Sequence, residues 1–82
     1  MRLKRKAKYS VNLLSPEGNA YALIALVVYL GRLKGIERKD VRAIQSRMMT
    51  AKLYNEVLDI IDQEFPGMVH FHNDPRKKKW RY

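Results

Sequence analysis

The chain has 82 residues, which is enough for one domain and too few for two. It contains no cysteine, which excludes disulfide bonds and a thiolate zinc site as sources of stability. Its net charge of +9 belongs almost wholly to the two ends, because residues 9–75 hold seven basic and eight acidic side chains. A domain of this size buries only about 60% of its unfolded surface, so its stability is marginal without further burial. Association into a homo-oligomer, most simply a homodimer, would supply that burial, and we expect it on this ground.

Both ends of the chain are basic and contain no acidic side chain. Such segments have little capacity to form a core. The sequence therefore predicts an N-terminal arm over residues 1–8, one globular domain over 9–75 and a C-terminal tail over 76–82.

The first predicted element of the domain is a strand over residues 9–13, where apolar and polar residues alternate. Eleven consecutive apolar residues then run from Ala20 to Leu30. A bilayer needs about 20 such residues, so the run predicts a helix buried on most of its surface. A signal peptide is the main alternative, but the turn residues of 15–19 separate the basic arm from the apolar run.

The start of this helix has two interpretations. Either Ser15 is the N-cap with Pro16 in the first turn, or Gly18 forms a turn and Asn19 is the cap. Gly35 predicts a left-handed helix end, with Ile36 folding back in a Schellman-type contact. Gly31 within the helix predicts the close approach of another element.

Two further helices follow. Apolar residues at helical spacing predict the first over about 39–49, and Thr50 is the expected N-cap of the second, over about 51–64. One face of the last helix is apolar through Tyr54, Val57, Leu58, Ile61 and Phe65. Pro66-Gly67 ends it, and residues 68–72 alternate again as a second strand.

The predicted fold is a small α+β domain of order β-α-α-α-β, with three helices packed on a two-stranded antiparallel ribbon. A lone pair of strands is barely stable, so the ribbon must pack on the helices. Antiparallel pairing would bring residues 9 and 72 together and merge the two basic arms into one patch.

Three short stretches resemble small uncharacterised proteins of tailed bacteriophages. The first is Leu13 to Leu23, a strand that runs into a Gly-Asn-Ala turn and an apolar helix. The second is Met48 to Asp62, a Met-Met pair, a tyrosine and an apolar-acidic helix, and the third is the strand Phe65 to Val69. The resemblance implies a phage origin, the cytoplasm of an infected bacterial host and a three-helix α+β body, but no activity.

The basic segments predict binding to nucleic acid, because lysine and arginine neutralise phosphates and release counterions. Trp80 and Tyr82 are suited to stacking on unpaired bases. The middle helix adds a basic surface. The predicted nucleic-acid-binding residues are Arg2, Lys4, Arg5, Lys6, Lys8, Arg38, Lys39, Arg42, Arg76, Lys77, Lys78, Lys79, Trp80, Arg81 and Tyr82. The sequence does not distinguish RNA, DNA or a ribonucleoprotein, and solubilising tails that bind nothing are the simpler alternative.

The last helix carries the acidic residues Glu56, Asp59 and Asp62, which would repel phosphate and argue against a helix-turn-helix reader. They suggest an alternative function, an inhibitor or adaptor that binds a host or defence protein.

No catalytic motif, cofactor motif or P-loop is present, so we expect a protein that is not an enzyme and takes no cofactor. His70 and His72 share one side of a strand, but a metal needs a third ligand, so no metal site is predicted. A membrane partner is not expected, although Lys and Trp also suit anionic headgroups.

Overall fold

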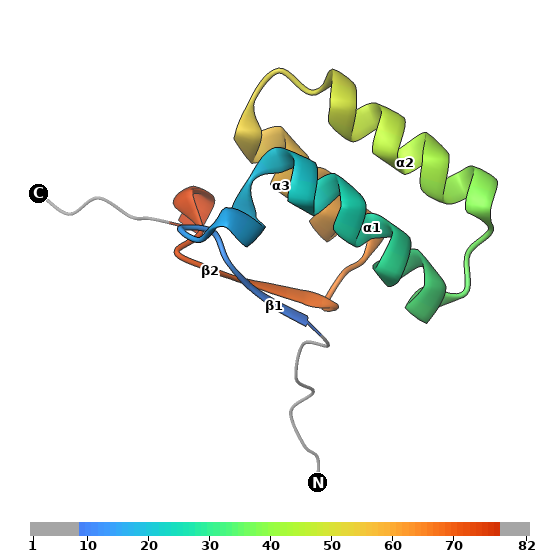
Figure 1. Cartoon of the computed structure of the whole chain (residues 1–82), viewed down its shortest axis with the longest axis horizontal. Helices are drawn as coiled ribbons and strands as arrows, with labels where there is room; N and C mark the ends of the chain where they lie inside the picture. The colour runs from blue at the N-terminus through green and yellow to red at the C-terminus, as the bar shows by residue number, and fades with distance from the viewer. Residues whose placement is uncertain (1–8, 78–82) are drawn as a thin grey trace, which may run out of the picture.

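The computed structural model of the chain describes residues 9–77. Its elements are, in chain order, β1 (Tyr9–Asn12), the 3-10 helix η1 (Pro16–Gly18), α1 (Ala20–Lys34), α2 (Arg38–Thr50), α3 (Tyr54–Glu64), β2 (Val69–His72) and the 3-10 helix η2 (Pro75–Lys77). The three helices lie on one side of a two-stranded sheet, with α2 farthest from the strands (Figure 1). The predicted α+β class and element order are confirmed.

The two strands are parallel, so the prediction of an antiparallel ribbon is wrong. The register pairs Tyr9 with Val69 and Asn12 with His72. Three helices that alternate in direction return the chain to the end of the sheet at which β1 begins (Figure 1). A parallel pair needs a connection of a dozen residues or more between its strands, and the three helices provide that length. Because their number is odd, the chain enters β2 in the same direction as β1.

Parallel pairing also removes the geometry from which the merging of the basic arms was expected. Tyr9 opens β1 and His72 closes β2, so these residues lie at opposite ends of the sheet. At a rise of about 3.3 Å per residue, they are separated by about 10 Å along the strands. Residues 1–8 and 78–82 lie outside the described part of the chain.

Asn19 is the N-cap of α1, so the second interpretation of this helix start is confirmed, and Ser15 instead caps the short helix η1 that precedes it. Ser15 Oγ accepts a backbone N–H of η1 at 3.3 Å, and Asn19 Oδ1 accepts a backbone N–H of the first turn of α1 at 2.8 Å. Gly18 lies between the two caps, where an added Cβ would be 2.5 Å from the Cα of Leu13. Only glycine fits there, and its turn joins β1 to α1.

The predicted end of α1 is confirmed. Gly35 has a φ of 83°, in the left-handed region. The N–H of Ile36 donates to the carbonyl of Gly31 at 3.1 Å, which is the long bond of a Schellman motif. This geometry turns the chain directly into α2.

The predicted cap at Thr50 is wrong. Thr50 is the last residue of α2, and its hydroxyl donates to two carbonyls of the preceding turn at 3.2 and 3.1 Å. A threonine that bonds back into its own helix cannot cap the next one. Instead α3 begins at Tyr54 after Leu53, and the carboxylate of Glu56 accepts the N–H of Lys52 at 3.0 Å.

The core is one group of buried side chains from all three helices and the inner face of the sheet. Strand alternation is confirmed, because Val11 and Phe71 are buried while their neighbours in sequence are exposed. The apolar face of α3 is also confirmed, with Ile60 added to it. The buried apolar residues are Val11, Leu23, Val27, Leu30, Val41, Ile44, Met48, Val57, Leu58, Ile60, Ile61, Phe65 and Phe71.

Tyr54 connects the start of α3 to the turn before α1, since its hydroxyl donates to the carbonyl of Gly18. Burial, and secondarily the charge of Asp74, raises the pKa of the Tyr54 phenol above its ordinary value of 10. The phenol therefore ionises at lower pH in the unfolded chain than in the folded protein. It contributes stability below about pH 10 that is lost as the pH rises toward the folded-state pKa.

We predict that Tyr54→Phe lowers the free energy of unfolding by about 1 kcal/mol at neutral pH, because the variant cannot form this hydrogen bond. Above about pH 10 the difference between the two proteins should shrink, since only the parent protein loses the contribution of a neutral Tyr54. Urea denaturation between about pH 7 and pH 11 measures both effects. A difference that stays constant over this whole range would contradict the assignment.

Gly31 lies where α2 packs closely on α1, as a small residue at this position predicts. An added Cβ would lie 2.5 Å from Cγ2 of Val41, whose branched side chain has little freedom to move. We predict that Gly31→Ala lowers the melting temperature, although alanine favours a helix by about 1 kcal/mol. The physical reason is overpacking, which costs about 1–3 kcal/mol.

The double substitution Gly31→Ala with Val41→Ala is the control, because it removes the colliding methyl groups. In this background the alanine at position 31 should stabilise the protein relative to Val41→Ala alone. Thermal melts followed by circular dichroism measure the four proteins of this cycle. A higher melting temperature for Gly31→Ala alone would show that the helices do not pack at this distance.

Candidate nucleic-acid interface

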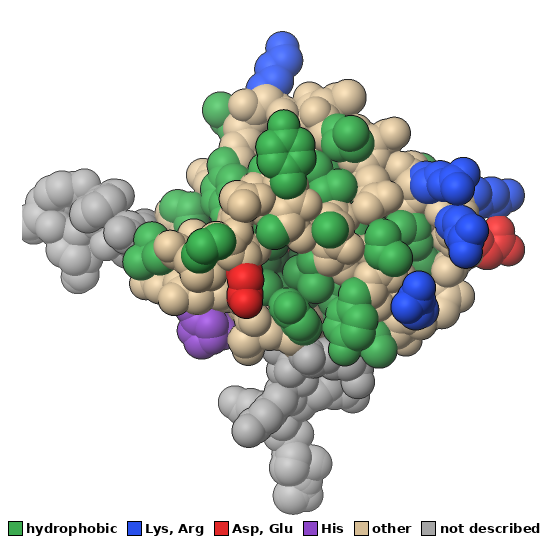
Figure 2. All heavy atoms as spheres, in the orientation of Figure 1, with side chains coloured by type: hydrophobic (Ala, Val, Ile, Leu, Met, Phe, Trp, Pro, Cys, Tyr) green, Lys and Arg blue, Asp and Glu red, His purple; other side chains and the backbone are tan. Residues whose placement is uncertain are grey.

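A groove of about 530 Å³ lies along the contact between α1 and α2, and we call it the arginine groove. Three of its lining side chains are the arginines Arg32, Arg38 and Arg42. Its remaining walls come from Val28, Ile36, Val41 and Gln45. Figure 2 shows Lys and Arg side chains gathered at the right of the molecule, over the corner where α1 ends and α2 begins.

The positions of these arginines follow from local structure. Arg32 lies in the last turn of α1, and Arg38 and Arg42 lie one turn apart on α2. The close approach at Gly31 and the bond from Gln45 Nε2 to a carbonyl of α1, at 2.8 Å, fix the spacing of the two helices. The groove is therefore built on helices that a hydrogen bond and a tight contact hold together.

The arginine groove is electrostatically unbalanced. Within residues 9–77, Arg32, Arg38 and Arg42 are exposed and form no ion pair or side-chain hydrogen bond. By contrast, Arg47 on the same helix pairs with Glu64 at 2.7 Å. The three arginines thus carry charge that the described fold does not use.

Two of these charges also work against α2. Arg38 lies in its first turn, where the helix dipole disfavours cations by about 0.3–1 kcal/mol. Arg38 and Arg42 are four residues apart, a spacing at which like charges repel. A bound anion would relieve both penalties.

The structure brings together two of the predicted residues, Arg38 and Arg42. Lys39 lies on α2 outside the groove lining, 3.9 Å from Glu37, with both side chains largely exposed. Sequence reasoning missed Arg32, which α1 contributes. Its position beside Gly31 was the available signal. Gly31 lets α2 approach α1 closely, so the next residue, Arg32, lies at the edge of that contact.

Arg76, which the sequence assigned to the C-terminal tail, lies at the centre of an ion-pair cluster. It meets Asp74 at 2.6 Å, Asp62 at 2.8 Å and Asp59 at 2.9 Å, and its guanidinium lies 5.6 Å from the centroid of the Phe71 ring. The hydrogen bond to Asp74 is the main cause that raises the pKa of Arg76 above its ordinary value, against the opposing effect of burial. This cluster fastens the segment after β2 to α3.

The same cluster engages the carboxylates of the predicted protein-binding surface. Asp59 and Asp62 pair with Arg76, and Glu56 accepts the N–H of Lys52. Each carboxylate of the alternative site therefore already has a partner within the chain. Its charges are less available to another protein than the arginines of the groove.

The other predicted residues fall at or beyond the ends of the described part. Lys77 ends η2. The residues outside the described range are Arg2, Lys4, Arg5, Lys6, Lys8, Lys78, Lys79, Trp80, Arg81 and Tyr82.

His70 and His72 lie side by side on the exposed face of β2, with ring centroids 4.4 Å apart and ring planes at 83°. In the stretch 9–77, no group of three or more His, Asp or Glu side chains is arranged to hold a metal ion. Across the same stretch, none of the helices combines the length and apolar character that a bilayer crossing requires.

No protein-family model, curated protein or solved structure matches this chain. The arrangement of its own residues is therefore the basis on which its function is inferred.

We predict that Arg76→Met destabilises the protein by about 3 kcal/mol, because the buried carboxylate of Asp74 loses its cationic partner. Arg47→Met is the matched control. It removes an arginine from an exposed pair with Glu64 and should cost less than about 1 kcal/mol. Urea unfolding of both variants tests this, and equal losses of stability would show that the cluster does not hold the C-terminal segment.

Proposed function

We propose that this protein is a small non-enzymatic binding protein that engages nucleic acid, alone or in a ribonucleoprotein, through the arginine groove and its basic arms. The observation that supports this most is the meeting of Arg32, Arg38 and Arg42 in one groove without a carboxylate partner in residues 9–77. Positive charges that repel one another and have no carboxylate partner in the described chain are available to bind a polyanion.

The chemistry of arginine favours the phosphate backbone as the ligand. Its planar guanidinium donates two parallel hydrogen bonds to a phosphate. Three such groups on two rigid helices can contact neighbouring phosphates of one strand. Contacts of this kind are tolerant of sequence and depend strongly on salt.

The basic arms supply further cationic side chains in the proposal. Residues 1–8 carry five basic side chains, and residues 77–82 carry four more with Trp80 and Tyr82. Arg76 is not counted among them, because the ion-pair cluster holds it. Aromatic side chains beside cations stack on unpaired bases, so we propose a preference for single strands. The resemblance to tailed-phage proteins leads us to propose the cytoplasm of an infected bacterium as the setting.

We predict that Arg42→Gln reduces the slope of log affinity against log salt by about 0.7 to 0.9 for each phosphate that the variant no longer neutralises. The measurement is titration of the full chain against fluorescent single-stranded and double-stranded oligonucleotides over a salt series. Arg47→Gln is the matched control, because it removes the same charge from the same helix on a paired arginine. Its slope should equal that of the parent protein.

Equal slopes for the two variants would contradict the arginine groove as the site. The arms are tested separately by neutralising Lys4, Arg5, Lys6, Lys77, Lys78 and Lys79 in the full chain. Affinity retained in that variant would remove the arms from the proposal. Absence of binding to either oligonucleotide at low salt would overturn the function as a whole.

A further inference from the structure

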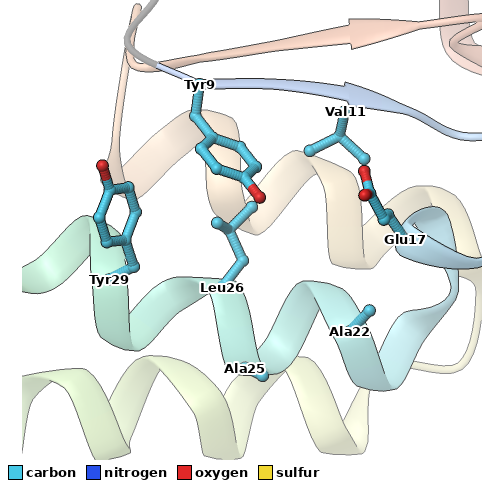
Figure 3. Close-up of a pocket in the computed structure, with 7 residues that line it drawn as sticks. All are labelled: Tyr9, Val11, Glu17, Ala22, Ala25, Leu26 and Tyr29. Atoms are coloured by element: carbon cyan, nitrogen blue, oxygen red, sulfur yellow. The ribbon is translucent and has the colours of Figure 1, made fainter.

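A second groove, which we call the β1 groove, lies between β1 and α1 and has a volume of about 350 Å³. Tyr9 and Val11 point from β1 toward α1, and Tyr29 points up from α1 (Figure 3). The rings of Tyr9 and Tyr29 lie 5.7 Å apart at one end of the groove. Glu17 lies at the other end, beside Val11 (Figure 3).

The floor of the β1 groove is a helical stripe that the sheet does not cover. Ala22, Ala25, Leu26 and Tyr29 follow the spacing i, i+3, i+4, i+7 and share one face of α1. Ala25 is exposed, and Tyr29 is 45% exposed. The two strands therefore leave part of the apolar stripe of α1 uncovered, and one further strand beside β1 would cover it.

The edge of β1 that borders the groove has free backbone groups. The N–H groups of Tyr9 and Leu13 donate to the β2 side at 3.0 Å. Because alternate residues bond across a parallel pair, Ser10 and Asn12 direct their N–H groups away from β2. In the described part of the chain the sheet has no third strand to receive them.

This edge also lacks the usual protection against pairing. Natural edge strands carry a charge, a proline or a bulge that prevents edge-to-edge association. The sequence of β1, Tyr-Ser-Val-Asn, contains neither a charge nor a proline. An unprotected edge beside an apolar groove is suited to an added strand.

We propose that β1 of a second copy of this chain fills the β1 groove, paired antiparallel about a two-fold axis at Ser10. The two copies of Ser10 then exchange a pair of N–H to carbonyl hydrogen bonds. Tyr9 lies opposite Val11 of the partner subunit, so apolar side chains of both strands cover the α1 stripes. The result is a continuous four-stranded sheet with an isologous interface.

Charge complementarity favours this occupant and this direction. Among the described residues that line the β1 groove, the charged one is Glu17, at the end where β1 finishes. An antiparallel partner brings the start of its own β1 to that end, and in sequence this start follows the basic residues 2–8. A strand added in the parallel direction would bring those cations to the tyrosine end instead.

The absence of cysteine from the chain allows a direct test, because Ser10→Cys introduces a single thiol. Paired Cα atoms across the axis would lie about 5.5 Å apart, within the range of a disulfide. Mild oxidation should convert most of this variant into a covalent dimer. Ser46→Cys, at an exposed position of α2, is the control and should stay uncross-linked under the same conditions.

Sedimentation equilibrium of the full chain gives the second readout. The parent protein should have twice the 9.7 kDa mass of one chain. Ser10→Pro removes the N–H that crosses the axis and should weaken the dimer by about tenfold or more. Ser10→Ala keeps the N–H and should leave the dimer unchanged.

Ala25→Glu places a charge on the α1 stripe and should weaken the dimer similarly, whether or not Ser10→Pro folds. Ala43→Glu, on the exposed side of α2, is its control and should have no effect. A 9.7 kDa monomer at every concentration overturns the proposal and leaves residues 1–8 or another protein as the occupant. A dimer that survives Ala25→Glu overturns it as well. These outcomes are independent of nucleic-acid binding.

Discussion

The constraint on which the rest of this structure depends is the apolar surface of α1. Leu23, Val27 and Leu30 are fully buried on one side of this helix, while Tyr21 is 84% exposed and Leu33 is 46% exposed on others. A helix that is apolar on most of its circumference has to be covered from several directions. A domain of this size has little material with which to do so. Together α2, α3 and the sheet cover only part of the apolar surface of α1, and both grooves border the part that stays exposed.

The arginines of the described chain differ in whether they have a carboxylate partner. Arg76 and Arg47 are held by carboxylates and serve the fold, one in a buried cluster and the other on the surface. Arg32, Arg38 and Arg42 converge without such partners in the described chain. Repulsion between Arg38 and Arg42 disfavours the fold slightly, and a bound anion would offset it. This physical difference, rather than the total charge, directs the proposal to the groove between α1 and α2.

Local features of the sequence were sufficient for most elements. Alternation defined both strands, the spacing of apolar residues defined α3, and Gly35 defined the end of α1 through its left-handed conformation. Thr50 misled because a threonine hydroxyl can cap a following helix or bond back into its own, and only the path of the chain decides between them. Arg32 was missed because helical periodicity does not say which neighbour a residue will border.

By itself the sequence determined the α+β class, the order of the elements and the location of the excess charge in the arms, because these depend on local spacing and composition. The tertiary structure decided the direction of β2 relative to β1, since that depends on how three helices alternate before the chain returns. It also decided which charges are neutralised. Arg76 reaches Asp59 across 17 positions of sequence, whereas Arg32 meets Arg38 and Arg42 only because Gly31 lets α2 come close. Contacts between distant residues follow from packing, and packing is not encoded in any single stretch of the chain.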